Sequence, residues 1–329
     1  MGSMHAQAYG QIRGAQICGL VDTRAGASRT MEALGISAPL FKDLEAALAK
    51  VDADMVDICL PTPLHEKAAL MALAHGKAVF LEKPIALEMA AAKRIVGAAA
   101  KSGLPVQVGH CIRFWPEYQA LEELVKSGRP GRLLSLSLQR RSPAPTHSIG
   151  DWLLDEEQSG GAAVDLHIHD TDFVLHLLGR PDAVTSSATE DRNGLSHIFT
   201  SYDFGDKAVV SEGGWNYPPK WGFQMAYQAV FERCAVEFDS RTGTFITQGT
   251  TAKKPLPVRQ PRVGASKAKT GNISSLGGYY NELASFLGCL EAGKMPVLAT
   301  PQQAADSLRV VLAEVESARK GRTVLLKNK

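Results

Sequence analysis

Short apolar runs and amphipathic stretches alternate through residues 15–109 of the chain. The apolar runs predict strands, and the amphipathic stretches predict helices, several of which end at a glycine. Strands are expected at residues 16–21, 55–60, 78–81 and 105–109, and helices at residues 24–34, 44–50, 63–75 and 86–102. This alternation is typical of an α/β domain, in which helices cover both faces of a parallel sheet.

Beyond about residue 118 the pattern changes to consecutive strand-like segments. Strands are expected at residues 133–139, 183–189, 196–204, 208–215 and 227–238, and helices at residues 164–178, 279–290 and 301–318. We predict a second, α+β domain, with a large, mainly antiparallel sheet and its helices on one face. The polar segment 242–275 is interpreted as a solvated loop, with an anion-binding lid as the alternative.

The composition fits a folded chain with two domains, which we place at residues 1–118 and 119–329. A chain of 329 residues exceeds the size that one core usually supports, and 45% of its residues are apolar. The formal net charge of +2 argues against a nucleic-acid partner, which requires a large basic surface.

The five cysteines are scattered, and none stands in C-x-x-C spacing. They indicate neither a disulfide framework nor a zinc site, and a cytoplasmic protein fits them best. No apolar run approaches the length of a membrane span, and the start lacks the features of a signal peptide, so no membrane partner is expected.

Asp22 follows the strand expected at residues 16–21, twenty residues after Gly2. In parallel α/β folds an acid at this place accepts hydrogen bonds from a ribose 2′-hydroxyl, about twenty residues beyond a glycine fingerprint. A helix-capping aspartate is an equally good interpretation. Arg24 could pair with a 2′-phosphate that Asp22 would repel, so NAD is favoured over NADP.

The strand at residues 78–81 continues into Glu82, Lys83 and Pro84. Ligands bind at the carboxyl edge of such sheets, and the proline restricts Lys83 to extended backbone geometry. Taken alone, these charges are better explained by a solvated strand end. Arg113 and His110 follow the last strand of the first half and belong at the same edge, although this segment could also be only an interdomain hinge.

The helix expected at residues 164–178 carries Asp165 and His169 four residues apart and therefore on one face. A histidine is suited to take an alcohol proton at neutral pH. A core histidine is one alternative. A metal site is another, but a helix points His167 and His169 about 200° apart, so we expect no metal.

Five segments together resemble the Gfo/Idh/MocA oxidoreductase family over nearly the whole chain. They read MGSMHAQAY, GLVDTR, DICLPTPLHEKAALMALAHGKAVFLEKP, VGHCIRFWP and GGAAVDLHIHD. The resemblance implies a Rossmann-type domain followed by a substrate-binding and oligomerisation domain. Members carry a first strand and a G-x-G ahead of the position of Gly2, so the sheet is expected to lack that strand.

The resemblance further implies NAD(P)-dependent hydride transfer with a secondary alcohol or ketone of a sugar, polyol or cyclitol. His169 would abstract the alcohol proton, Lys83 would stabilise the alkoxide, and Asp165 would hold Lys83 and the substrate hydroxyl in register. The candidates for the cofactor are Gly2, Met4, His5, Asp22, Arg24, Leu60, Pro61, Thr62, His65, Glu82, Arg113 and Lys83 itself. Those for the substrate are His110, Trp152, Trp215, Tyr217 and Tyr279.

Two other functions remain open at this point. A non-catalytic sensor or scaffold with impaired cofactor binding would explain the absent part of the glycine fingerprint, and a metal hydrolase would use the acidic and histidine side chains of residues 165–176. The exposed face expected on the second sheet and the family resemblance imply a homodimer or homotetramer.

Overall fold

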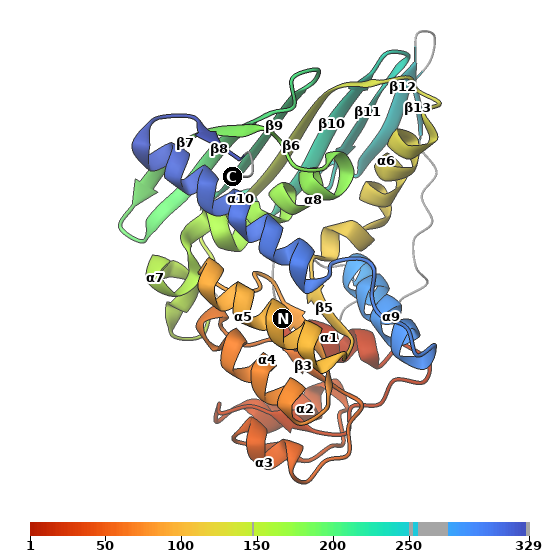
Figure 1. The fold of residues 1–329 in the computed structure, drawn as a ribbon, viewed down its shortest axis with the longest axis vertical. Helices are drawn as coiled ribbons and strands as arrows, with labels where there is room; N and C mark the ends of the chain where they lie inside the picture. Colours follow the sequence, from red (N-terminus) through yellow and green to blue (C-terminus); the bar gives the residue numbers. More distant parts are fainter. Residues whose placement is uncertain (147, 250–252, 256–275, 327–329) are drawn as a thin grey trace. The chain divides into compact units, whose positions relative to one another are not determined.

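The computed structural model describes residues 1–146, 148–249, 253–255 and 276–326. The chain forms two compact units (Figure 1), Met1–Cys111 with Pro261–Ala305 and Ile112–Gln260 with Asp306–Lys329. The first crossing between the units, at Cys111, precedes the domain boundary that the sequence places after residue 118.

All strands described in the first unit pair in parallel, as predicted. They are β1 (Leu20–Val21), β2 (Leu40–Phe41), β3 (Met55–Ile58), β4 (Ala78–Glu82) and β5 (Val106–Gly109). Among the described residues these strands form two separate sheets, β1–β2 and β3–β4–β5.

The helices of the first unit follow the predicted order. They are α1 (Gly2–Tyr9), α2 (Ala27–Leu34), α3 (Leu44–Leu48), the short η1 (Thr62–Leu64), α4 (His65–Ala74), α5 (Met89–Ser102) and α9 (Gly277–Glu291). Gly35 and Gly103 end α2 and α5 with φ of 67° and 65°, a backbone conformation that side chains disfavour. The glycine stops read from the sequence are therefore confirmed.

Helix α9 corrects one expectation. The sequence places the helix at residues 279–290 on the second-domain sheet, but its Leu283 and Phe286 pack in one core with Phe80 of β4 and Ala8 of α1. The Phe80 and Phe286 rings meet edge to face at 5.7 Å. Helical periodicity shows that a helix has an apolar face, but it does not show which surface covers that face.

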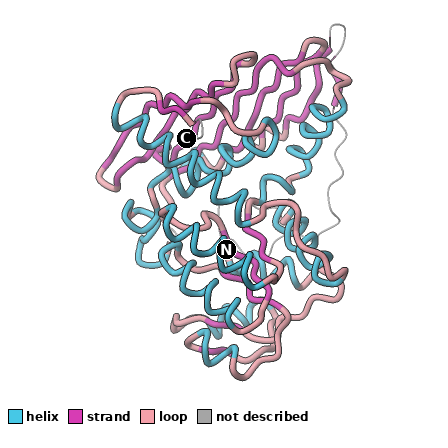
Figure 2. The backbone as a smooth tube through the Cα atoms, viewed as in Figure 1, coloured by secondary structure: helices cyan, strands magenta, loops and turns pink. Residues whose placement is uncertain are grey.

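The second unit is built on a nine-stranded sheet with the order β13-β12-β11-β10-β6-β9-β8-β7-β14 (Figure 2). Every neighbouring pair is antiparallel except β6 and β9, which run parallel, so the sheet is mainly antiparallel as predicted. Its strands are β6 (Leu133–Pro143), β7 (Ala183–Asp191), β8 (Gly194–Asp203), β9 (Ala208–Tyr217), β10 (Gln224–Phe231), β11 (Cys234–Asp239), β12 (Thr244–Gly249), β13 (Lys253–Pro255) and β14 (Val324–Leu325).

One face of this sheet is covered by helices. Along β8, Ile198 and Tyr202 are buried and Phe199 is exposed, as expected when only one face is covered. Thr171 of α8 donates to Glu314 of α10 at 3.0 Å and links two of the covering helices. The helical elements are η2 (Cys111–Phe114), α6 (Pro116–Ser127), η3 (Ile149–Leu154), α7 (Glu156–Ser159), η4 (Ala163–His167), α8 (Ile168–Leu178), η5 (Pro219–Trp221) and α10 (Pro301–Lys320).

Two further expectations for this half were wrong. The run at residues 227–238 is not one strand, because the chain turns at Glu232 and Arg233 between β10 and β11. Helix α6 was missed, since the sequence pattern assigned no element to this stretch. The loop expected at residues 242–275 contains β12 and β13, and its residues 250–252 and 256–275 lie outside the described part of the chain.

None of the helices in the described ranges combines the length and the apolar character that crossing a membrane requires.

Candidate active site

Lys83 follows β4 directly, and it is the one residue of 78–86 that is not buried. Its backbone N–H donates to Glu82 Oε2 at 3.0 Å. Strand β4 is buried along its whole length because α4 and α9 both pack against it. The lysine therefore leaves a rigid strand end at the carboxyl edge of a parallel sheet, where such folds place ligand contacts.

Glu82 is one of three neighbouring ionisable side chains, with His5 and Asp57. His5 of α1 lies between two carboxylates, with Nε2 2.9 Å from Glu82 Oε1 and Nδ1 2.8 Å from Asp57 Oδ2. Burial opposes a charge on His5, but Asp57 and Cys59 together outweigh it, so the His5 pKa is raised well above its usual value. Burial likewise acts against the Glu82 charge, and the hydrogen bond from His5 lowers the pKa of Glu82.

Asp22 lies directly after β1, where the sequence predicts the ribose-binding acid. Its carboxylate accepts hydrogen bonds from the backbone N–H of Arg24 at 2.8 Å and from the guanidinium of the same residue. These bonds lower the pKa of Asp22. Helix α2 begins at Gly26 without a side-chain cap, which contradicts the alternative that Asp22 caps a helix. Lys42 Nζ donates to the carbonyls of Asp22 and Arg24 at 3.1 and 3.3 Å.

Other predicted cofactor residues cluster around the starts of α1 and α4. Gly2 begins α1, and none of the described side chains caps that helix, so its first turn is a candidate anion site. Met4 and Thr62 are buried, whereas Leu60 is 39% exposed. Pro61 precedes η1.

His65 has a supporting role within this unit. Its ring nitrogens lie 2.9 Å from the carbonyl oxygens of Pro84 and Leu60. Burial lowers the His65 pKa, so the ring is neutral and only one of its nitrogens donates a hydrogen bond. His65 thus holds the segment after Lys83 against the loop after β3.

In the second unit, Asp165 and His169 stand out from a buried stretch. Every other residue from 161 to 174 is buried, whereas these two are half-buried. Asp165 belongs to η4, a single π-helical turn, and His169 is the second residue of α8. π-helical turns recur at functional sites because they change the direction of side chains within a helix.

The neighbouring polar side chains face the interior of the same unit. His167 Nε2 lies 3.1 Å from Glu314 Oε2, and Asp170 pairs with Arg140 through two hydrogen bonds. Asp172 accepts two hydrogen bonds from Arg113. These residues hold the helix in the core, so they do not form the metal set that the sequence left open.

The predicted substrate residues are divided between the two units. His110 and Trp215 are buried, and Trp152 is half-buried in η3. Tyr279 of α9 belongs to the first unit, where its ring lies 6.3 Å from that of His5. The predicted cofactor contact Arg113 is 3% exposed and belongs to the second unit.

Tyr217 belongs to a polar cluster on the second sheet. Its hydroxyl donates to Glu212 Oε1 at 2.8 Å, and Arg141 Nε donates to the same oxygen at 2.7 Å. His197 Nε2 lies 3.2 Å from it. Burial opposes the Glu212 charge, but the hydrogen bonds from His197 and Arg141 outweigh it and lower the Glu212 pKa to about 2.

Sequence reasoning missed Lys42, Asp57, Cys59 and Glu282. Asp57 and Cys59 belong to the segment DICLP, where two polar groups alternate with apolar residues in a strand expected to be buried. That alternation was a usable signal. Glu282 gave none, because a single acid in an amphipathic helix usually faces solvent.

Two models of one family match the chain. The model described as "Oxidoreductase family, NAD-binding Rossmann fold" matches residues 1–110, and the GFO/IDH/MocA C-terminal domain matches residues 118–221.

Characterised relatives match over most of their length. The chain is 24% identical to 1,5-anhydro-D-fructose reductase of Ensifer adhaerens, over 95% of this chain and 92% of that protein. It is 26% identical to inositol 2-dehydrogenase of Corynebacterium glutamicum, over 88% and 90%. A structure of levoglucosan dehydrogenase with NADH and levoglucosan superimposes with a TM-score of 0.83 at 18% identity, covering 100% of this chain and 97% of that one. The chain is therefore an NAD(P)-dependent oxidoreductase of the Gfo/Idh/MocA family.

Proposed function

We propose that the enzyme moves a hydride between the nicotinamide and a secondary alcohol or ketone of a sugar, polyol or cyclitol. The names of the relatives support this class, since each acts on a carbohydrate or a cyclitol. The observation that supports the proposal most strongly is which polar side chains are exposed to solvent. Lys83, Asp165 and His169 are the residues that reach solvent from otherwise buried stretches. Rigid elements that present a few polar groups are what an active site requires.

Each of these side chains has a chemical task that suits its type. The bound nicotinamide supplies the hydride acceptor or donor. His169 takes the hydroxyl proton, because an imidazole titrates near neutral pH. The Lys83 ammonium stabilises the negative charge that develops on the oxygen, and Asp165 orients the substrate hydroxyl.

The first unit fits the cofactor at two places. The uncapped start of α1 offers backbone N–H groups to a pyrophosphate, and Asp22 offers its carboxylate to a ribose diol after β1. Asp22 favours NAD because it repels a 2′-phosphate. Arg24 and Lys42 beside it reduce that repulsion.

The test is turnover with a panel of polyols, cyclitols and anhydrosugars, each with NAD+ and with NADP+, followed by the absorbance of the reduced nicotinamide. Lys83→Ala should lower kcat at least a hundredfold while binding of the reduced cofactor, measured by its fluorescence, is retained. Lys93→Ala removes an exposed lysine of α5 and is the matched control. Cofactor binding without turnover of any alcohol or ketone would indicate a sensor instead.

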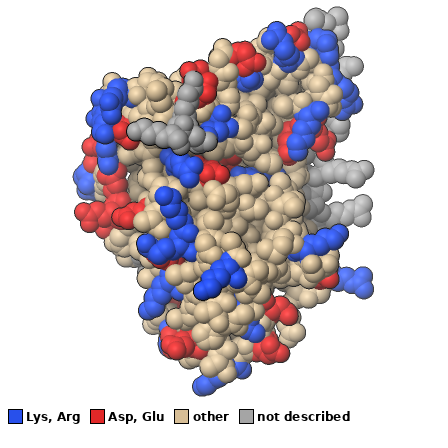
Figure 3. Space-filling view, in the orientation of Figure 1, with Lys and Arg blue, Asp and Glu red and all other residues tan. Residues whose placement is uncertain are grey.

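We further propose a cytoplasmic homo-oligomer without a nucleic-acid partner. Exposed apolar side chains lie on the central strands of the second sheet, Phe199, Val210 and Val230 among them. Five free cysteines suit a reducing compartment. On the face drawn in Figure 3, basic and acidic side chains are interspersed and leave no single-sign surface for a polyanion.

A further inference from the structure

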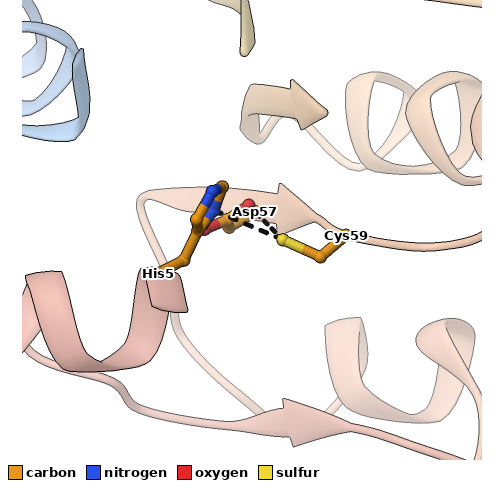
Figure 4. A group of neighbouring side chains, drawn as sticks. All are labelled: His5, Asp57 and Cys59. Carbon is orange, nitrogen blue, oxygen red and sulfur yellow. Dashed lines mark hydrogen bonds and ion pairs between the residues drawn. The ribbon is translucent and has the colours of Figure 1, made fainter. Parts of the chain in front are cut away.

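We propose a divalent transition-metal site, suited to zinc, formed by His5 Nδ1, the Asp57 carboxylate and Cys59 Sγ. The three side chains come from α1 and the end of β3 and point toward one another (Figure 4). Their ligand atoms lie within 4.8 Å of one another. The site contains none of the residues proposed for catalysis, Lys83, Asp165 and His169.

The separations match those between ligands on one ion. The Cys59 sulfur lies 3.3 Å from His5 Nδ1 and 3.4 Å from Asp57 Oδ1, and His5 Nδ1 lies 2.8 Å from Asp57 Oδ2. With usual zinc bond lengths, two ligand atoms of a tetrahedral site lie roughly 3.3–3.6 Å apart. Two of the three separations already fall near this range. The His5–Asp57 pair must open by about 0.5 Å, which is a small side-chain movement.

The donor set identifies the class of ion. One nitrogen, one sulfur and one carboxylate oxygen suit zinc, whereas magnesium and calcium prefer oxygen alone. Zinc would displace the proton of the Cys59 thiol and any proton on His5 Nδ1, both of which pass to water, so that the thiolate and the Asp57 carboxylate together balance its charge.

The surroundings of His5 also match a metal site. Zinc-bound histidines usually donate their second N–H to a carboxylate, and His5 Nε2 lies 2.9 Å from the buried Glu82. Asp57 and Cys59 are half-buried, which leaves a route for the ion and a fourth position for water.

A second group, His5 with Glu82 and Glu282, fits an ion less well. It offers no sulfur, and an ion on Nε2 would replace the ion pair of His5 with Glu82. The Nδ1 side is therefore the better site.

The metal would join α1 to β3. None of the described side chains caps α1, and a bond network between its His5 and the strand would hold this helix in place. Binding energy at such a site adds to the free energy of unfolding, because the unfolded chain does not preserve the ligand geometry.

The test uses the full chain, stripped with a chelator and then titrated with Co2+ and with Zn2+. We expect one ion per chain by elemental analysis, a thiolate-to-cobalt charge-transfer band in the near ultraviolet, and a higher Tm with Zn2+. Cys59→Ser should abolish the band, and Cys18→Ser, which removes another half-buried cysteine of the same unit, should keep it.

Two further variants keep the test decisive if Cys59→Ser does not fold. Asp57→Asn should retain the band but weaken binding at least tenfold, and Glu82→Gln should weaken it by about 10- to 100-fold through the histidine. The proposal is overturned if the wild-type chain binds no stoichiometric ion, or if the band survives in Cys59→Ser. Neither result affects the hydride-transfer proposal, which is judged by turnover.

Discussion

At the residue scale, the sequence was informative where a side chain stands at the end of a regular element. Lys83 follows a strand, and Asp165 and His169 were expected on one helical face. In the structure all three are half-buried, whereas their neighbours along the chain are buried. The sequence did not predict the role of Arg113. Nothing in its local motif indicates that the Arg113 guanidinium donates hydrogen bonds to Asp172 of α8. Partners of buried charges depend on tertiary packing, which the sequence pattern does not encode.

Glu212 and His197 predict a pH dependence of stability. The pKa of Glu212 is lowered to about 2, so its contribution is present above its unfolded pKa of about 4.5 and is lost as pH falls toward 2. Burial opposes a charge on His197, but the hydrogen bond to Glu212 raises its pKa, so its contribution is present below about 6.5 and is lost at higher pH. Both contributions to the free energy of unfolding depend on the contact between Glu212 and His197.

The Glu212→Gln variant separates this effect from general acid unfolding. The difference in free energy of unfolding between wild type and variant, from urea titrations at each pH, should be greatest between about pH 4.5 and 6.5 and should fall on both sides. Glu123→Gln changes an exposed acid of α6 and should give a nearly flat difference. A flat difference for Glu212→Gln as well would contradict the pairing.

At the element scale, periodicity located most helices and strands but not their exact ends or turns. Residues 227–238 are rich in apolar and aromatic side chains on both sides of Glu232 and Arg233. No glycine or proline marks the turn that these two residues form between β10 and β11. The stretch 116–127 begins with Pro116 at the first helical position and ends at Gly128 with φ of 62°. These are ordinary helix signals that the change of rhythm near residue 118 obscured.

The π-helical turn that carries Asp165 rests on Gly213 of β9. A Cβ added at Gly213 would lie 2.6 Å from His167 Nδ1 and 2.7 Å from its Cβ, so the turn would have to move. We expect Gly213→Ala to lower stability by about 1–3 kcal/mol and to lower kcat. Thermal unfolding and turnover measure the two effects.

Gly97→Ala in α5 is the matched control for this variant, because a Cβ there meets nothing within 4 Å. A helical alanine should stabilise the chain by about 0.5–1 kcal/mol relative to glycine and leave turnover unchanged. Equal stability of Gly213→Ala and wild type would show that the turn does not depend on this close approach.

At the scale of the whole molecule, composition and the change of rhythm predicted two domains with the correct sheet types. They could not predict that the chain returns to the first unit, where α9 covers β4 and brings Glu282 into the core. The buried row from Asp57 through His5 to Glu82 joins residues from three separate segments. Such a site depends on topology, so a pattern of spacings within one segment cannot reveal it.

The open face of the second sheet gives the last prediction. Phe199 is 51% exposed on β8 and Val210 is 45% exposed on β9, although both stand in strands whose other face is buried. Exposed apolar side chains on adjacent strands are typical of an interface, so we expect wild type to sediment as a dimer or tetramer at micromolar concentration. Phe199→Lys with Val210→Lys should shift it to monomer, because lysine at the centre of an interface leaves a desolvated charge. Val297→Lys, at a 78% exposed residue of the first unit, should leave the assembly unchanged. A double variant that sediments like wild type would place the interface elsewhere.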